Sequence, residues 1–159
     1  MKIAPLIVTG AGGYLGRRVI AALEANQVPH IGVTHSGGQF ACDLVDAAAV
    51  RELIRRAGAT TVIHCAARVP SDPKGFENEE LARASVKRVA NLIAAGPGHI
   101  VFTSTMTVYR NPQRLPVREE DASAGLSGYP AGKRAAEQLL LAAAGVRATI
   151  LRLPGLFGA

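Results

Sequence analysis

The chain has 159 residues, of which 48% are hydrophobic, and a formal net charge of +6. This length suits one domain over residues 1–159 with a hydrophobic core of its own, and the apolar content excludes a disordered chain. No apolar run approaches the roughly 18 residues of a membrane span, and the N-terminus lacks the pattern of a signal peptide, so we expect a cytoplasmic protein without a membrane partner. The basic residues form no stripe of the kind that binds nucleic acid, so we expect no nucleic-acid partner.

Short apolar runs alternate along the chain with longer segments of helical period. We expect strands at Leu6–Thr9, Val28–Val33, Thr61–Cys65, Ile100–Thr103 and Ala148–Leu151. Four helical patterns lie between or after them: on Leu15, Val19, Ile20 and Leu23; on Val50, Leu53 and Ile54 after an N-cap at Asp46; on Leu81, Val86, Val89, Leu92 and Ile93; and from about Ala131 to Ala144. The alternation predicts an α/β fold, a doubly wound parallel sheet in three α/β/α layers.

Two segments between these elements are expected to be surface loops. Tyr109–Gly128 holds prolines and several charges, and Asp72, Pro73 and Gly75 mark the second loop. Long loops in compact domains are usually functional or mobile.

A glycine-rich turn follows the first strand and opens the first helix. It runs TGAGGYLG from Thr9, with glycines at Gly10, Gly13 and Gly16. The first glycine permits a tight turn, the second lets the backbone approach a pyrophosphate, and the third lets the helix pack on the sheet. The N–H groups at the start of the helix, around Tyr14 and Leu15, and the positive end of its dipole would face the phosphates. The turn therefore predicts a dinucleotide site.

Further segments follow the turn in order. They are VIHCAA (Val62–Ala67), ANLIAA (Ala90–Ala95), TSTMTVYR (Thr103–Arg110), SGYPAGKRAAEQLL (Ser127–Leu140) and LRLPGLFG (Leu151–Gly158). Together with the TGxxGxxG turn, they resemble in register the motifs of the extended short-chain dehydrogenase/reductases, the NAD-dependent epimerase/dehydratase family. The resemblance covers essentially the whole chain. It implies a Rossmann domain that binds NAD or NADP for hydride transfer.

Tyr129 and Lys133 form the expected catalytic pair. They are four residues apart on a predicted helix, so both side chains lie on one face. We expect the Lys133 ammonium and a positive nicotinamide ring to lower the pKa of the Tyr129 phenol, which then acts as general base or acid. The resemblance gives Lys133 a second role, holding the cofactor ribose. It also places the catalytic hydroxyl at Thr105, with Ser104 as the competing candidate and a cofactor contact.

The residues around the adenosine half leave the form of the cofactor open. Thr34, His35 and Ser36 stand where NAD enzymes of this kind carry an acidic residue for the ribose hydroxyls, and its absence favours NADP slightly over NAD, although no Arg accompanies them. The resemblance places Asp43 and Leu44 beside the adenine.

Small residues are expected along the rest of the cofactor. Ala66 and Ala67, at the end of the third predicted strand, would let it pass, and the resemblance adds a contact from Pro154 in the last motif. Cys42 and Cys65 form neither a CxxC motif nor a cluster with histidine, so we expect no metal.

These features predict an NAD(P)-dependent oxidoreductase or epimerase acting on a small molecule, for which a nucleotide-linked sugar is the first choice. Met106 and Thr107 replace the Asp-Glu pair of the family's nucleotide-sugar dehydratases, so elimination of water is not expected. Two alternatives stay open: a ketoreductase for a lipid, steroid or polyketide, and a module that binds dinucleotide without turnover. Family members usually continue into a C-terminal substrate domain, most of which is expected to be missing here. The apolar surface thereby exposed predicts a homo-oligomer.

Overall fold

The computed structural model describes residues 4–37, 40–110, 112 and 114–157. In this part of the chain, five parallel strands form one sheet in the order β2-β1-β3-β4-β5. The strands are β1 (Leu6–Thr9), β2 (His30–Val33), β3 (Thr61–His64), β4 (His99–Thr105) and β5 (Arg147–Leu153). The helices are α1 (Tyr14–Ala25), α2 (Ala47–Ala57), α3 (Pro73–Phe76), α4 (Glu79–Ala94) and α5 (Gly128–Ala142), with 3₁₀ turns η1 (Met106–Tyr109) and η2 (Glu119–Asp121).

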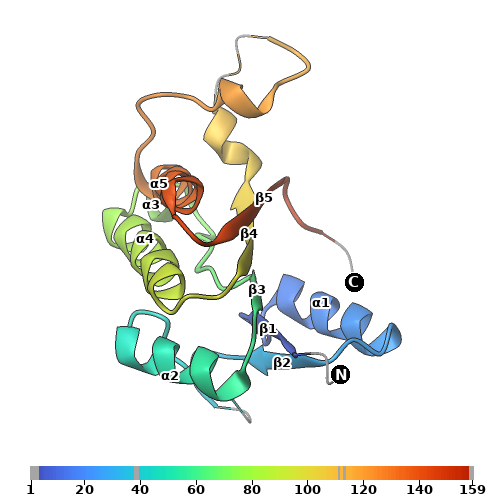
Figure 1. Ribbon diagram of the computed structural model, residues 1–159. Helices are drawn as coiled ribbons and strands as arrows, with labels where there is room; N and C mark the ends of the chain where they lie inside the picture. Colours follow the sequence, from blue (N-terminus) through green and yellow to red (C-terminus); the bar gives the residue numbers. More distant parts are fainter. Residues whose placement is uncertain (1–3, 38–39, 111, 113, 158–159) are drawn as a thin grey trace.

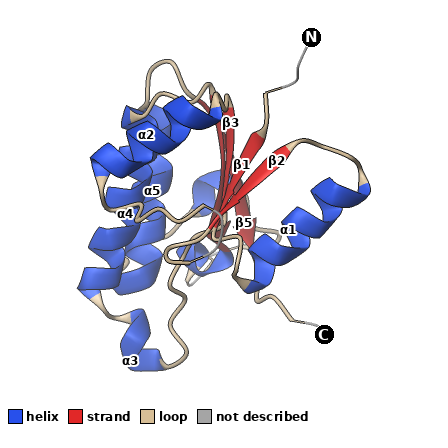
Figure 2. Cartoon of the chain, turned by 90° about the horizontal axis from the view of Figure 1, so that it is seen from below, coloured by secondary structure: helices blue, strands red, loops and turns tan. Residues whose placement is uncertain are grey.

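Helices lie on both faces of the sheet. α1 packs against β1 and β2 on one face, and α2, α4 and α5 cover the other (Figure 1, Figure 2). The hydrophobic core lies under the three-helix face, where the buried side chains include Ile7, Leu92, Ile100, Phe102 and Leu140. The predicted three-layer Rossmann architecture is confirmed.

Strand bounds differ from the prediction for local reasons. β2 begins at His30 instead of Val28, because the Val28 N–H still donates to Leu23 O and closes the end of α1. β3 ends one residue early, at His64. β4 and β5 pair with each other over seven residues each, so both extend beyond the predicted runs. Their ends carry hydroxyl or charged side chains, which a search for apolar runs misses.

Helix starts follow from capping residues. The Asp46 carboxylate accepts two backbone N–H groups in the first turn of α2, so this predicted N-cap is confirmed. The last helix spans Gly128–Ala142 instead of about Ala131–Ala144. It begins early because Gly128 turns the chain with a φ of +56°, and Pro130 in the first turn needs no N–H partner.

Both predicted loops contain short helical turns. In the Tyr109–Gly128 segment, the Arg114 guanidinium donates two hydrogen bonds to the Asp121 carboxylate of η2, at 2.9 and 2.8 Å. In the second loop, Asp72 caps α3 by accepting the Gly75 N–H at 2.9 Å. Polar contacts within each segment therefore help to hold it in place.

Apolar side chains are exposed near the carboxyl-terminal end of the described chain. Leu151 on β5, a strand at the edge of the sheet, is 43% exposed, and Phe157 is 94% exposed. The self-association expected from such surface stays a prediction.

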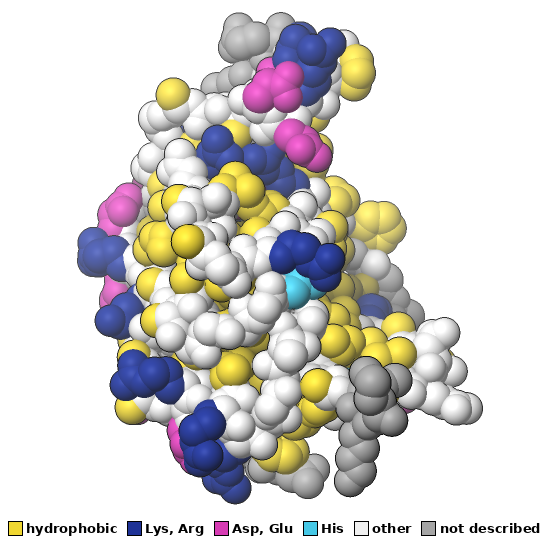
Figure 3. All heavy atoms as spheres, viewed as in Figure 1, with side chains coloured by type: hydrophobic (Ala, Val, Ile, Leu, Met, Phe, Trp, Pro, Cys, Tyr) yellow, Lys and Arg dark blue, Asp and Glu magenta, His cyan; other side chains and the backbone are white. Residues whose placement is uncertain are grey.

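On the face seen in Figure 3, Lys and Arg side chains are spread among apolar ones and not gathered in one patch. None of the helices in the described residues is long and apolar enough to cross a bilayer.

Candidate active site

The carboxyl ends of the strands meet at one edge of the sheet, where the strand order reverses. The chain runs from β1 outward to β2 and then crosses to β3 on the other side of β1, so the loops after β1 and β3 diverge and leave a crevice. Two pockets open there, and Gly13, Cys65 and Ala67 line both. The β2 pocket, beside β2, has a volume of about 420 Å³, and the β4 pocket, beside β4, of about 410 Å³. Each has the size of a small-molecule site.

The glycine-rich turn is shaped by close backbone contacts. Gly10 has a φ of +71°, and a Cβ at this position would lie 2.7 Å from the Ala66 Cα, so only glycine fits between β1 and the end of β3. A Cβ at Gly16 would collide with Gly10 O. Among the described residues, no side chain caps the start of α1 and its first turn holds no acid. The positive end of the α1 dipole is therefore open to an anion in the β4 pocket.

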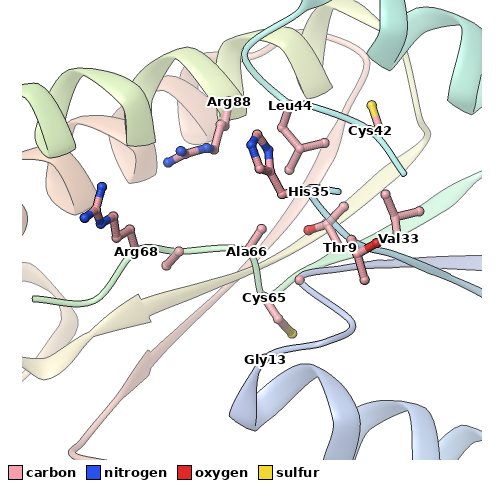
Figure 4. Close-up of a pocket in the computed structure, with 13 residues that line it drawn as sticks. Thr9, Gly13, Val33, His35, Cys42, Leu44, Cys65, Ala66, Arg68 and Arg88 are labelled. Atoms are coloured by element: carbon pink, nitrogen blue, oxygen red, sulfur yellow. The ribbon is translucent and has the colours of Figure 1, made fainter. Parts of the chain in front are cut away.

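The β2 pocket holds most of the residues predicted for the adenosine half of the cofactor (Figure 4). The predicted residues in its lining are Gly10, Gly13, Thr34, His35, Leu44, Ala66 and Ala67. Ser36 and Asp43 lie outside the lining of both pockets. The Asp43 carboxylate lies 3.7 Å from His35 Nδ1. A negative charge therefore lies near the end of β2, although residues 34–36 themselves include no acidic residue.

The β4 pocket brings together the three predicted catalytic residues. Thr105 comes from β4, and Tyr129 and Lys133 come from α5. The other predicted residues in its lining are Gly13, Tyr14, Leu15, Gly16, Ala67, Ser104 and Pro154. The last residue of the final motif, Gly158, lies outside the described residues. The glycine-rich turn and the catalytic pair thus share one cavity although they come from opposite ends of the chain.

Lys133 is buried at the base of the β4 pocket. Its side chain is 2% exposed. Its Nζ donates to Thr103 O at 2.8 Å and lies 4.6 Å from the centre of the Phe102 ring. Burial is the main cause that lowers the pKa of Lys133, to about 8, and the positive charge of Arg88 lowers it further. The role expected for Lys133 requires its side chain to be protonated, yet burial makes the protonated form less favourable.

Tyr129 faces the pocket with its hydroxyl. Its ring packs edge-on against Phe76, with centroids 5.5 Å apart. The hydroxyl makes no hydrogen bond to the described residues, and no fully buried side-chain oxygen there lacks a partner, so it is open to the pocket. The lowering of the Tyr129 pKa expected from a positive nicotinamide ring stays a prediction, but the lowering expected from Lys133 is not found, since burial raises this pKa. The reason is that the Lys133 ammonium lies 5.9 Å from the ring centre and is engaged with a backbone carbonyl.

The two candidate hydroxyls have different partners. Ser104 Oγ donates to the buried Glu137 carboxylate at 2.5 Å. Thr105 Oγ1 lies 3.0 Å from Thr107 Oγ1 and accepts the Thr107 N–H at 3.2 Å, at the more exposed end of β4. The hydroxyl of Thr105 can therefore turn toward a substrate, whereas that of Ser104 is committed to a buried acceptor.

Glu137, which belongs to the SGYPAGKRAAEQLL segment but was given no role in the sequence analysis, joins α5 to the ends of β4 and β5. Its fully buried carboxylate accepts hydrogen bonds from Arg152 at 2.7 and 3.0 Å and from Arg134 at 2.9 Å. Burial alone raises the pKa of Glu137, but these hydrogen bonds lower it overall. Arg152 also donates to Tyr109 Oη at 2.7 Å, so the network joins α5, β5 and η1.

Two cations that the sequence did not predict line the β2 pocket. They are Arg68, in the segment after β3, and Arg88, in α4. No Arg is adjacent to residues 34–36 in the sequence, but these two arginines, distant in sequence, line the same pocket as Thr34 and His35. Within the described residues, no three His, Cys, Asp or Glu side chains gather where they could hold a metal ion.

The buried ammonium predicts how stability depends on pH. Folding lowers the pKa of Lys133 from 10.5 to about 8. Between these values the unfolded chain binds more protons, so the free energy of unfolding rises with pH. Relative to Lys133→Met, wild type should gain up to about 1.4 kcal/mol per pH unit in this window. Urea unfolding of both proteins at several pH values measures the difference, and a difference independent of pH would contradict the buried charge.

Comparison with known proteins gives one family and several relatives. The model of the NAD dependent epimerase/dehydratase family matches residues 6–159. Methionine adenosyltransferase 2 subunit beta of Danio rerio is 32% identical over 159 residues, which covers 96% of this chain and 48% of that protein. UDP-glucose 4-epimerase of Azospirillum brasilense is 29% identical over 173 residues, covering 97% and 49%. The dTDP-4-keto-6-deoxy-D-glucose reductase of Streptomyces niveus is 28% identical over 155 residues, covering 96% and 52%. The chain spans about half the length of the curated relatives it matches.

Solved structures share the fold. UDP-glucose 4-epimerase from Brucella ovis in complex with NAD superposes with a TM-score of 0.83 at 23% identity, over 94% of this chain and 51% of that one. A short-chain dehydrogenase/reductase superfamily protein from Agrobacterium tumefaciens with bound NAD gives 0.71 at 27% identity, over 92% and 48%. At 23% identity the first of these supports the fold alone.

Proposed function

Since the chain belongs to the NAD-dependent epimerase/dehydratase family, we propose that it holds NAD or NADP along the two pockets and transfers hydride between the nicotinamide and a hydroxyl or carbonyl carbon of a nucleotide-linked sugar. One observation carries this proposal: the glycine-rich turn, Thr105, Tyr129 and Lys133 line a single cavity. A backbone turn that aims a helix dipole at an anion, beside a phenol and a hydroxyl open to the same space, suits this chemistry.

The residues present fit a dinucleotide. The glycine-rich turn allows backbone to approach a pyrophosphate, and the helix that follows offers the positive end of its dipole. Leu44 and Ala66 give the β2 pocket an apolar part, as an adenine ring requires. Lys133 and Tyr129 line the β4 pocket together with the start of α1. The two pockets adjoin at Gly13 and can therefore hold the two halves of one ligand.

The chain's own residues would handle the proton while the bound cofactor supplies the hydride chemistry. The Tyr129 phenol is protonated at neutral pH, as any tyrosine is, and burial raises its pKa further, so it can donate a proton to a carbonyl oxygen that is being reduced. In the reverse direction the phenolate form of Tyr129 accepts the alcohol proton, and the Lys133 ammonium on the same helix face favours that form, although it does not outweigh burial in the chain alone. Thr105 donates a hydrogen bond to the same substrate oxygen and orients it.

Two relatives support a nucleotide-linked sugar as the substrate class. Their names describe a UDP-glucose epimerase and a dTDP-sugar reductase. Met106 and Thr107 carry no carboxylate, so dehydration is not proposed. Hydride returned to the opposite face of the same carbon would give an epimer, and hydride kept by either partner would give a net oxidation or reduction.

Incubation of the full gene product with cofactor and UDP- or dTDP-linked sugars tests the proposal: an epimer, or a change in nicotinamide absorbance, is expected.

The form of the cofactor can be measured directly. The preference for NADP expected from residues 34–36 gains no support from the comparisons, since both solved structures named above hold NAD. We expect the chain to bind either form, with dissociation constants for NADH and NADPH within about tenfold of each other. Titration read by nicotinamide fluorescence gives both values. A larger preference would contradict this expectation and identify the cofactor that the site was built for.

A second candidate function is a dinucleotide-binding module without turnover. One relative, at 32% identity, is named as a subunit of a methionine adenosyltransferase and not as an epimerase or reductase. The two functions share the cofactor pockets and differ in what Tyr129, Lys133 and Thr105 do. Binding of cofactor without reaction on any nucleotide sugar or ketone would favour the module, whereas turnover of a lipid-like, steroid or polyketide ketone would favour the ketoreductase alternative.

A further inference from the structure

The β2 pocket carries positive charge without an opposing acid in its lining. Arg68 and Arg88 line it, and no Asp or Glu does. Within the part of the chain that the structure describes, neither guanidinium has a hydrogen bond or an ion pair. Unpaired arginines that line a concave site raise the potential there and attract anions.

The two side chains approach the pocket from different elements. Figure 4 shows Arg88 descending from α4 and Arg68 rising from the segment after β3, and both side chains line the pocket. Gly13, at the start of α1, lies on the opposite side. A ligand between them would meet backbone N–H groups on one side and guanidinium groups on the other.

The positive charge of Arg88 also affects two buried residues, Lys133 and His64. It lowers the pKa of Lys133 and of the buried His64, whose pKa is about 3 mainly because of burial. Like charges held close together destabilise one another, and a bound anion relieves that repulsion. Binding of an anion between these cations is therefore expected to be favourable.

We propose that Arg68 and Arg88 form an anion site that binds a phosphate group of the dinucleotide, across the pocket from the glycine-rich turn. This inference rests on the proposed function and adds side-chain donors that no motif of the sequence indicated. The planar guanidinium donates paired N–H groups that match two phosphate oxygens. The dinucleotide offers two sources of that chemistry, the pyrophosphate and, in NADP, the 2′-phosphate.

Titration of the full chain with NADH and NADPH tests the site. Arg68→Ala and Arg88→Ala should each weaken binding by about tenfold, as expected for the loss of a charge-assisted hydrogen bond, and the double variant should lose more. An equal loss for both cofactors assigns the pyrophosphate, and a loss confined to NADPH assigns the 2′-phosphate. Either result supports the anion site.

Arg83→Ala is the matched control. Arg83 lies on the same helix, is exposed, and lies outside the β2 pocket, so this variant removes the same charge and should change both affinities less than about twofold. Arg88→Lys keeps the charge but not the paired donors and should show an intermediate loss, which keeps the test valid if an alanine variant does not fold. Wild-type affinities in a folded double variant would overturn the anion site and leave the proposed function standing. A wild-type chain that binds neither cofactor would overturn both.

Discussion

Replacing Glu137 by alanine is expected to lower the free energy of unfolding by about 3–5 kcal/mol. The carboxylate is fully buried and accepts hydrogen bonds from Arg152, Arg134 and Ser104. Its removal leaves Arg152, whose side chain is only 12% exposed, without its main counter-charge. An unpaired buried charge costs far more than the pair itself contributes. Urea-induced unfolding at neutral pH measures the loss.

A matched control separates burial from charge. Glu52 and Arg55 on α2 form an ion pair with the same closest separation, 2.7 Å, as Glu137 and Arg152. The Glu52 pair is exposed, with side chains 51% and 72% accessible, so Glu52→Ala should lower the free energy of unfolding far less than Glu137→Ala does. Similar losses in the two variants would show that burial does not set the strength of the Glu137 network.

The position of Glu137 ties this stability to the site. Tyr129, Lys133 and Glu137 follow one another at intervals of four residues, so they lie along one face of α5. Glu137 holds the end of β4 through Ser104 and holds β5 through Arg152. The network therefore fixes how α5 sits against the strand that carries Thr105. The stability of this corner and the geometry of the catalytic residues depend on the same contacts.

The parts of the site that follow from local chemistry were predictable. The glycine-rich turn is an example, because Gly10 must accept a positive φ and lie against the backbone of the β3 end, and only glycine does both. The Asp46 cap is another, since a carboxylate just before an apolar helical pattern has few other uses. The four-residue spacing of Tyr129 and Lys133 needs only the pitch of a helix.

The parts that depend on tertiary structure could not be read from the sequence. Arg68 and Arg88 enter the β2 pocket only because β3 and α4 both reach the reversal point of the sheet, and neither residue belongs to a motif. The pKa of Tyr129 was predicted from two positive groups, its neighbour Lys133 and the nicotinamide ring. Burial of the ring, and the engagement of Lys133 with Thr103 O, reverse its direction. Once burial removes an ionisable group from water, its surroundings in the fold determine its pKa more than its spacing from a charged residue in the sequence does.

The largest functional effect is expected for Tyr129→Phe. Loss of the phenol hydroxyl removes the proton donor from the β4 pocket, so turnover of a nucleotide-linked sugar should fall by about 10²–10⁴-fold. Affinity for NADH or NADPH should change by less than about threefold, because the ring still packs against Phe76 and the glycine-rich turn is untouched. Steady-state turnover and fluorescence titration of the same preparations measure the two effects.

Tyr109→Phe provides the comparison that makes this result specific. It also removes a tyrosine hydroxyl, one that accepts a hydrogen bond from Arg152 at 2.7 Å and lies outside both pockets. This variant should lose about 1 kcal/mol of stability and keep its turnover. If both variants lost turnover equally, the effect would come from weakened packing of the α5 corner. If Tyr129→Phe retained full turnover, the proton would travel by another route, and the phenol would be a packing residue of a cofactor-binding domain.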